Sequence, residues 1–169
     1  MNLPINKESP VVTDRPQLDL ANYLPYLVNR LGGALVANMI ENTLAPYDLT
    51  IDMWRLLAVL SYRGAQRQVD LVDMTSIEAS TVSRLVTRLV RLALVTRRRS
   101  TTSNREVVIE LTAKGRAQVE RIIPNALKLE QIASAGVPAK DMAVVKRSLR
   151  RMYENMSAQR SSELVRPRK

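Results

Sequence analysis

The chain contains no cysteine and no histidine among its 169 residues. Without cysteine it can form no disulfide bond, thiol redox sensor or thiolate nucleophile. Without histidine it lacks the usual general base, and zinc sites built on His and Cys are excluded as well. No nucleophile–base pair or glycine-rich phosphate loop is recognisable in the rest of the sequence. We therefore expect neither an enzyme nor a bound cofactor or metal.

Aromatic residues and glycine are also scarce, with no Phe, one Trp, five Tyr and five Gly. The 46% hydrophobic content is nevertheless enough for a folded core, which must be aliphatic and suits a mainly helical protein. No apolar run reaches the ~18 residues of a membrane span, and the first ten residues lack the apolar stretch of a signal peptide. A cytoplasmic location without a membrane partner is the expectation.

Positive charge is abundant and unevenly distributed. The net charge is +10, and seven arginines but no carboxylate lie between Glu78 and Glu106. Such a segment indicates binding to a polyanion, because it concentrates positive potential where counterions are released. A second basic cluster, interpreted either as a nucleic-acid contact or as a solubilising tail, comprises Lys146, Arg147, Arg150, Arg151, Arg160, Arg166, Arg168 and Lys169.

Hydrophobic periodicity divides the chain into seven elements. A helix is expected over residues 19–43, where Pro25 either starts the regular part or introduces a kink. Three further helices are expected over residues 52–62, over 68–75 and from Ser80 onward, and the first of them is capped by Asp48 or Thr50. A β-hairpin of 94–98 and 106–111 follows, and then helices over 112–135 and 139–164.

Two short helices followed by a β-ribbon are typical of the winged helix–turn–helix arrangement. The predicted fold is therefore mainly α with a small β-hairpin wing, extended by long N- and C-terminal helices. These long helices carry more apolar surface than one small domain can cover, which favours a homodimer. The predicted domains are a flexible arm (1–17), an N-terminal dimerisation helix (18–47), the winged domain (48–111), C-terminal dimerisation helices (112–165) and a basic tail (166–169).

The segment Ser80–Arg99, STVSRLVTRLVRLALVTRRR, sorts into two faces on a helical wheel. One face is aliphatic, and the opposite one carries only hydroxyls and guanidiniums. Such a face can enter the major groove of double-stranded DNA, where Arg pairs with guanine and hydroxyls reach bases or phosphates. Alternatively, Arg84 and Arg88 pair with acids elsewhere in the chain, for which Asp70 and Asp73 on the preceding helix are the candidates. The candidate major-groove residues are Ser80, Thr81, Ser83, Arg84, Thr87 and Arg88.

Four arginines of the hairpin extend this surface. Arg97, Arg98 and Arg99 follow one strand and are candidates for phosphate contacts. Arg105 flanks the loop and can reach a narrow minor groove, whose negative potential attracts arginine.

Residues 49–115 resemble the multiple-antibiotic-resistance regulator family (MarR) of bacterial transcription factors. The similar segments are LTIDMWRLLAVL at 49–60, STVSRLVTRL at 80–89 and REVVIELTAKGR at 105–116, in the same order and at the same spacing. The resemblance implies a homodimer that reads a pseudo-palindromic operator and responds to a small ligand. It assigns residues 80–88 to the recognition helix and Arg105 to the wing. The acid that commonly stands two residues before the wing arginine is replaced here by Ser103.

A small aromatic acid or its aryl-CoA thioester is the expected effector. This chemistry is what the resemblance implies, since phenolic and aryl acids serve as ligands in the family. The residues support an organic ligand, because peroxide sensing through thiols and His-based metal sensing are excluded. The candidate ligand-binding residues are Tyr23, Tyr26, Arg30 and Trp54. Tyr26 and Trp54 are equally compatible with a purely structural role in the hydrophobic core. The predicted function is a ligand-responsive repressor; the alternative is a winged-helix nucleic-acid-binding protein without an effector site.

Overall fold

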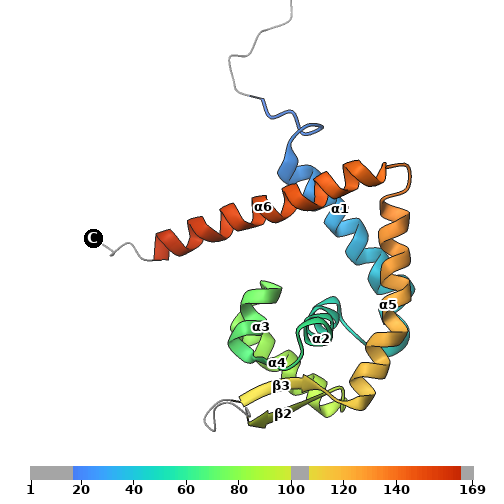
Figure 1. Cartoon of the computed structure of the whole chain (residues 1–169), viewed down its shortest axis with the longest axis vertical. Coiled ribbons are helices and arrows are strands. Elements are labelled where there is room, and N and C mark those ends of the chain that lie inside the picture. Colours follow the sequence, from blue (N-terminus) through green and yellow to red (C-terminus); the bar gives the residue numbers. More distant parts are fainter. Residues whose placement is uncertain (1–16, 100–106, 165–169) are drawn as a thin grey trace, which may run out of the picture. The chain divides into compact units, whose positions relative to one another are not determined.

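The computed structural model of the protein describes residues 17–99 and 107–164. The chain divides into two compact units, one ending at Ala34 and the other beginning at Leu35. Figure 1 labels the elements along the chain. The predicted flexible arm, the hairpin loop with Arg105 and the basic tail lie outside the described residues, apart from Gln17. The helices are α1 (Leu24–Met39), α2 (Ile51–Arg63), α3 (Gln68–Thr75), α4 (Ala79–Arg91), α5 (Ala113–Ala133) and α6 (Ala139–Leu164).

Helix α1 begins at Leu24, five residues later than the sequence pattern predicts. The carboxylate of Asp19 explains the difference, because it accepts hydrogen bonds from the backbone of Ala21 at 3.1 Å and from the side chain of Asn22. These local bonds stabilise a turn in place of a helix. Pro25 then occupies the second helical position, where its missing N–H costs nothing. Of the two roles considered for Pro25, it takes the one of starting the regular helix.

The end of α1 differs from the prediction of an uninterrupted helix to Thr43. A π-helical turn covers Ile40–Leu44 and is followed by a 3₁₀ turn over Ala45–Tyr47. Pro46 lacks the N–H that would continue α-helical hydrogen bonding through this segment. The segment ends at Asp48, whose backbone is left-handed with φ 52°. Short π-helical turns are uncommon and are frequently associated with functional sites.

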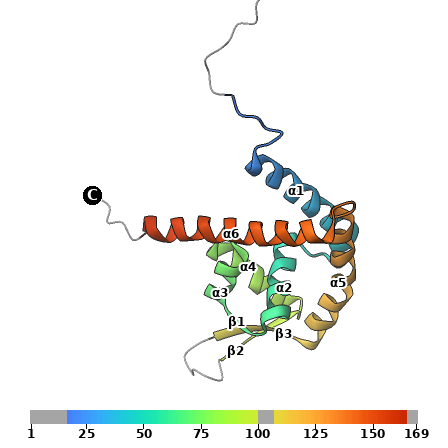
Figure 2. The same ribbon diagram turned by 45° about the horizontal axis from the view of Figure 1, so that its top comes forward.

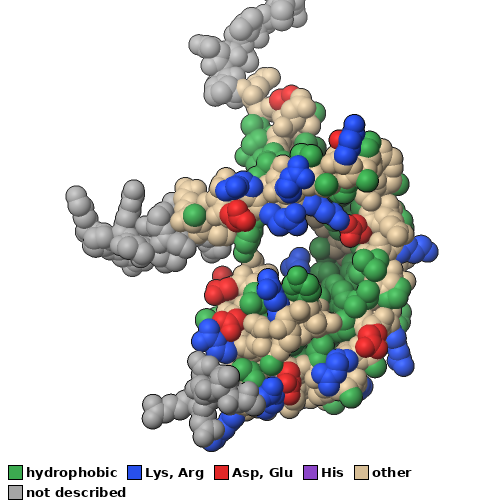
Figure 3. All heavy atoms as spheres, viewed as in Figure 1, with side chains coloured by type: hydrophobic (Ala, Val, Ile, Leu, Met, Phe, Trp, Pro, Cys, Tyr) green, Lys and Arg blue, Asp and Glu red, His purple; other side chains and the backbone are tan. Residues whose placement is uncertain are grey.

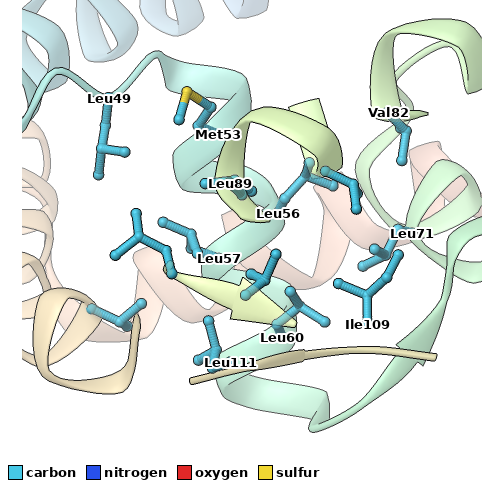
Figure 4. Packing of buried hydrophobic residues seen from close by; sticks show 14 of the residues in the cluster. Leu49, Met53, Leu56, Leu57, Leu60, Leu71, Val82, Leu89, Ile109 and Leu111 are labelled. Atoms are coloured by element: carbon cyan, nitrogen blue, oxygen red, sulfur yellow. The ribbon is translucent and has the colours of Figure 1, made fainter. Parts of the chain in front are cut away.

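Helix α2 carries the centre of the hydrophobic core. The hydroxyl of Thr50 accepts a hydrogen bond from the backbone N–H of Met53 at 3.2 Å, so Thr50 rather than Asp48 is the N-cap. Gly64, with φ 77°, ends the helix. Figure 4 shows side chains of α2, α3, α4 and strand β3 pointing toward one another. The fully buried members of this core include Met53, Leu56, Leu57, Leu71, Val82, Leu89 and Ile109.

The hairpin of β2 (Val95–Arg99) and β3 (Val107–Leu111) confirms the predicted ribbon. Arg97 lies directly opposite Ile109, and Arg98 lies opposite Val108. The sequence pattern missed β1 (Gln66–Arg67), which pairs with the other edge of β3 and gives a three-stranded antiparallel sheet of order β1-β3-β2 (Figure 2). Two residues are too short a run to show a period, so β1 has no sequence signal of its own.

Helices α5 and α6 complete the second unit. Helix α5 starts with the hydroxyl of Thr112 accepting a hydrogen bond from the N–H of Gly115 at 2.9 Å, and it continues through Pro124. Gly136 and Pro138 separate α5 from α6, and Gly136 has φ 80°. No helix of the described residues is long and apolar enough to span a membrane.

Candidate nucleic-acid interface

Helix α4 has one buried face and one exposed polar face. Val82, Val86 and Leu89 are at most 1% exposed and anchor the helix in the core. Ser80, Arg84 and Arg88 are exposed, while Thr81, Ser83 and Thr87 are half-buried. The two faces match those predicted from the helical wheel. The six candidate major-groove residues therefore form one side of a helix whose other side is immobilised by packing.

The polar face of α4 is ordered by bonds within the helix. The guanidinium of Arg84 donates to the hydroxyl of Thr81 at 3.1 Å, and the hydroxyl of Thr87 donates to the carbonyl of Ser83 at 3.0 Å. Glu78 occupies the N-cap position, but its side chain makes no capping hydrogen bond. No carboxylate of α4 itself faces the arginines, so the positive charge of this face is not neutralised from within the helix.

The predicted alternative, in which Arg84 and Arg88 pair with acids elsewhere in the chain, holds for Arg88 but not with the suggested partners Asp70 and Asp73. Arg88 does pair with a carboxylate, but it is that of Asp48, with 2.9 Å between Nη2 and Oδ2. The Asp48 side chain is 84% exposed, so this ion pair is weak and can exchange for a phosphate contact.

Asp70 is engaged with Arg67 at the start of α3. The Arg67 guanidinium donates to both carboxylate oxygens, at 2.8 and 2.7 Å, and the backbone N–H of Arg67 also donates to Asp70. The side-chain hydrogen bond from Arg67, opposed in part by desolvation, holds the pKa of Asp70 below its ordinary value. This pair fixes the N-terminus of α3, the helix that precedes the polar helix α4 in the chain.

The wing arginines lie on opposite faces of the sheet. Arg97 shares a face with buried Ile109 and donates to the hydroxyl of Thr87 on α4 at 3.1 Å. Arg98 points to the other face, where its Nε lies 2.8 Å from a carboxylate oxygen of Glu110. Only Arg97 of this pair is thus joined to the polar face of α4. Figure 3 shows Lys and Arg side chains beside the hairpin and along α6.

The C-terminal end of α4 is held by the start of α5. Ala93 has a left-handed backbone with φ 57°, and its carbonyl accepts from the hydroxyl of Thr112 at 2.7 Å. The ammonium of Lys114 donates to the carbonyl of Leu92 at 3.0 Å. Gly115 lies so close to Leu94 that a Cβ at position 115 would be 1.9 Å from the Leu94 carbonyl oxygen. This contact explains why a glycine stands in the segment TAKG at 112–115.

The predicted ligand residues are divided between the two units. In the first unit the Arg30 guanidinium lies 5.7 Å from the centre of the Tyr26 ring, and Tyr23 is exposed. In the second unit the half-buried Trp54 packs against the hydrophobic core. Two other tyrosines, Tyr47 and Tyr62, do not share an environment: Tyr47 packs against the core, whereas Tyr62 is 82% exposed.

Helices α3 and α4 are followed by a β-hairpin, and α4 exposes a cationic face. This arrangement defines a winged helix–turn–helix DNA-binding protein. The family model described as the MarR family matches residues 49–107. The chain is 26% identical to the transcriptional repressor NicR of Pseudomonas putida over 108 residues, which cover 64% of this chain and 68% of the relative. It is 30% identical to the transcriptional regulator YwoH of Bacillus subtilis, over 57% of this chain and 70% of the relative.

Solved structures agree with these sequence relatives. A MarR family regulator from Silicibacter pomeroyi is 28% identical, with a TM-score of 0.73, and the match covers 80% of this chain and 91% of that one. BpsR of Bordetella bronchiseptica, whose DNA binding is regulated by 6-hydroxynicotinic acid, is 29% identical with a TM-score of 0.67, over 76% and 97% of the two chains. The chain belongs to the MarR family. It is a DNA-binding transcriptional regulator and not an enzyme.

Proposed function

We propose that this regulator is a cytoplasmic homodimeric repressor, which binds a pseudo-palindromic operator and is released by a small aromatic carboxylate or its CoA thioester. The proposal of DNA binding rests on the exposed face of α4. This face consists of hydroxyls and guanidiniums, and Arg97 connects it to the wing. Ser80, Thr81, Ser83, Arg84, Thr87 and Arg88 read the major groove. Arg97, Arg98, Arg99 and Arg105 supply wing and phosphate contacts.

The apolar stripe of α6 supports a homodimer. Met142 is half-buried, and Val145, Leu149, Met152 and Met156 are exposed although they lie on one side of the helix. A row of apolar side chains that residues 17–99 and 107–164 leave uncovered marks an interface. Two copies related by a twofold axis present two α4 helices, which suits an operator with two half-sites about one DNA turn apart.

The relatives support the repressor role and the kind of effector. NicR is named a repressor, and BpsR is regulated by 6-hydroxynicotinic acid, an aromatic carboxylate. On this chain Tyr23, Tyr26, Arg30 and Trp54 are the proposed aromatic and cationic contacts for such a ligand. The alternative, in which Tyr26 and Trp54 are only core residues, is favoured for Trp54 by its packing against the core.

Selection of bound fragments from random duplex DNA, followed by footprinting, tests the operator. We expect a protected site with two half-sites, and release on addition of 6-hydroxynicotinate, benzoate or benzoyl-CoA but not of peroxide. Sequence-specific binding that none of these compounds releases would instead support the winged-helix protein without an effector site.

Arg84→Ala tests the assignment of α4 as the base-reading helix. Loss of a bidentate contact to guanine weakens operator binding by about 1–3 kcal/mol and relaxes specificity at one base pair of each half-site. Random DNA, bound mainly through its phosphates, should be affected far less. If the variant lost the same affinity for operator and for random DNA, Arg84 would not be one of the residues that contact bases.

A further inference from the structure

Helix α6 carries a second cationic surface, which the proposed operator contacts do not use. Between Asp141 and Glu154 the helix has no carboxylate but four cationic residues, Lys146, Arg147, Arg150 and Arg151. The three arginines border an open hollow of about 620 Å³ on the side of α6. Figure 3 shows Lys and Arg side chains gathered along the same helix. We call these three arginines the cationic face of α6.

The positive charge of the cationic face is largely unneutralised. Arg147 and Arg150 make no hydrogen bond or ion pair with any residue of the described ranges 17–99 and 107–164. Arg151 has a carboxylate oxygen of Glu154 at 3.9 Å, but the two side chains are 78% and 66% exposed, so this ion pair is weak. Lys146 is different, because it pairs with Glu130 of α5. The face therefore presents three guanidiniums to solvent.

The cationic face points away from the other two surfaces of α6. At about 100° per residue, Arg147 and Arg151 each lie about 160° around the helix from Leu149, which belongs to the apolar stripe proposed for the dimer. Tyr153 marks the side toward the winged domain, because its hydroxyl lies 3.4 Å from that of Ser76 in the turn between α3 and α4. Arg147 and Arg151 are about 120° and about 160° away from Tyr153. Dimerisation through the stripe thus leaves both arginines uncovered.

We propose that the cationic face of α6 binds the phosphate backbone of a second DNA duplex, so that the protein bridges its operator to another DNA segment. The inference rests on the proposed operator binding. Guanidinium, hydroxyl and carboxamide groups are common partners of DNA phosphates, and Ser148 and Asn155 supply the last two beside the arginines. Phosphate contacts carry no sequence information, so the second segment needs no particular sequence.

The shape and composition of the cationic face favour a duplex over other anionic partners. All residues that border the hollow come from α6 alone, so the hollow cannot enclose a small anion as a ligand pocket does. The centre of a protein interface is depleted of charge, whereas this face carries three arginines and the apolar stripe lies on the opposite side. An open row of guanidiniums suits a polyanion, from which it releases condensed counterions.

A bridging assay tests the proposal with the full-length protein. A duplex carrying the selected operator is immobilised, saturated with protein and offered a fluorescent duplex of random sequence. We expect retention of the labelled duplex, which falls steeply as salt is raised. Arg147→Gln/Arg151→Gln should weaken retention by about tenfold or more and make its log–log salt slope shallower by about two units, while operator affinity changes by less than about twofold. Arg121→Gln/Lys128→Gln removes the same charge from exposed positions of α5 and should leave retention unchanged.

The proposal is overturned if the unaltered protein binds the operator but retains no second duplex, or if the Arg147→Gln/Arg151→Gln protein retains as much as the unaltered one. An equal loss in the α5 variant would show that net charge, and not this face, holds the labelled DNA. A parallel loss of operator affinity in the α6 variant would place the face on the operator itself and overturn the second duplex. Failure of the proposed function appears separately, as the lack of sequence-specific binding to the immobilised operator.

Discussion

The guanidinium of Arg97 donates a hydrogen bond to the hydroxyl of Thr87, with 3.1 Å between Nη2 and Oγ1. This bond connects the edge strand of the wing to the middle of α4. The neighbouring Arg98 faces the other side of the sheet and is paired with Glu110. Adjacent arginines that look equivalent in the sequence therefore have different surroundings.

Arg97→Ala should weaken binding to operator and random DNA alike, because it removes a positive charge beside the groove-reading face. The slope of log affinity against log salt concentration should become shallower by about one unit. Arg98→Ala is the comparison: as a phosphate contact it should also make the slope shallower, but by less, because Glu110 already neutralises part of its charge. Affinities measured at several salt concentrations decide this. A larger change of slope in Arg98→Ala than in Arg97→Ala would contradict the expectation.

Gly115→Ala should lower the free energy of unfolding by about 3 kcal/mol, since the added methyl group meets the backbone of Leu94 and neither backbone segment can move cheaply. Urea denaturation followed by circular dichroism measures the change. Gly33→Ala is the control, because a Cβ there has no neighbour within 4 Å. That variant should be as stable as the original or up to about 1 kcal/mol more stable. Equal stability of the Gly115→Ala variant would mean that α5 shifts freely relative to Leu94.

Asp70→Asn should reduce stability at neutral pH by about 0.5–1 kcal/mol, as it weakens the partly exposed contacts with Arg67. The pKa of Asp70 is lowered by folding, so the carboxylate stabilises the protein fully above its unfolded pKa of about 3.8. The contribution is lost as the pH falls through the folded pKa. The stability difference between the two proteins should therefore shrink in acid. Asp73→Asn, on the same helix, should leave the stability at neutral pH unchanged.

Leu149→Glu should separate the proposed dimer, because it places a charge in the middle of the apolar stripe of α6. We expect a monomer in analytical ultracentrifugation and a large loss of operator affinity. Asn155→Glu adds the same charge to α6 outside the stripe and should remain dimeric. A Leu149→Glu protein that stays dimeric would place the dimer interface on another surface.

The local pattern of apolar and polar residues was sufficient to predict much of the fold. The bounds of α3 and α6 agree with the predicted ranges 68–75 and 139–164, and the apolar positions of α4 are those that are buried. The hairpin was predicted as well, because alternating β-branched residues flank a run of turn-forming residues. These features depend on side chains within one or two turns of each other, so they can be read along the chain.

The start of α1, the π-helical turn and strand β1 were not predicted correctly. A side-chain bond from Asp19 competes with the helix at its start, and a proline removes one donor at its end. Strand β1 exists only because β3 offers it an unpaired edge. In each case one local structure competes with another, such as a turn with a helix or a strand with a loop. The spacing of hydrophobic residues does not describe such a competition.

The sequence by itself determined that this is a cationic, mainly helical winged protein, because hydrophobic period and the absence of acids from one helix face are properties of single segments. Tertiary structure alone decided that Arg88 pairs with Asp48, that Arg97 rather than Arg98 contacts α4, and that polar groups from α1, the π-helical turn and α5 line one cavity. The physical reason is that these contacts join residues 10 to about 90 positions apart. Their partners are selected by packing and by the pleat of the sheet, which no local pattern records.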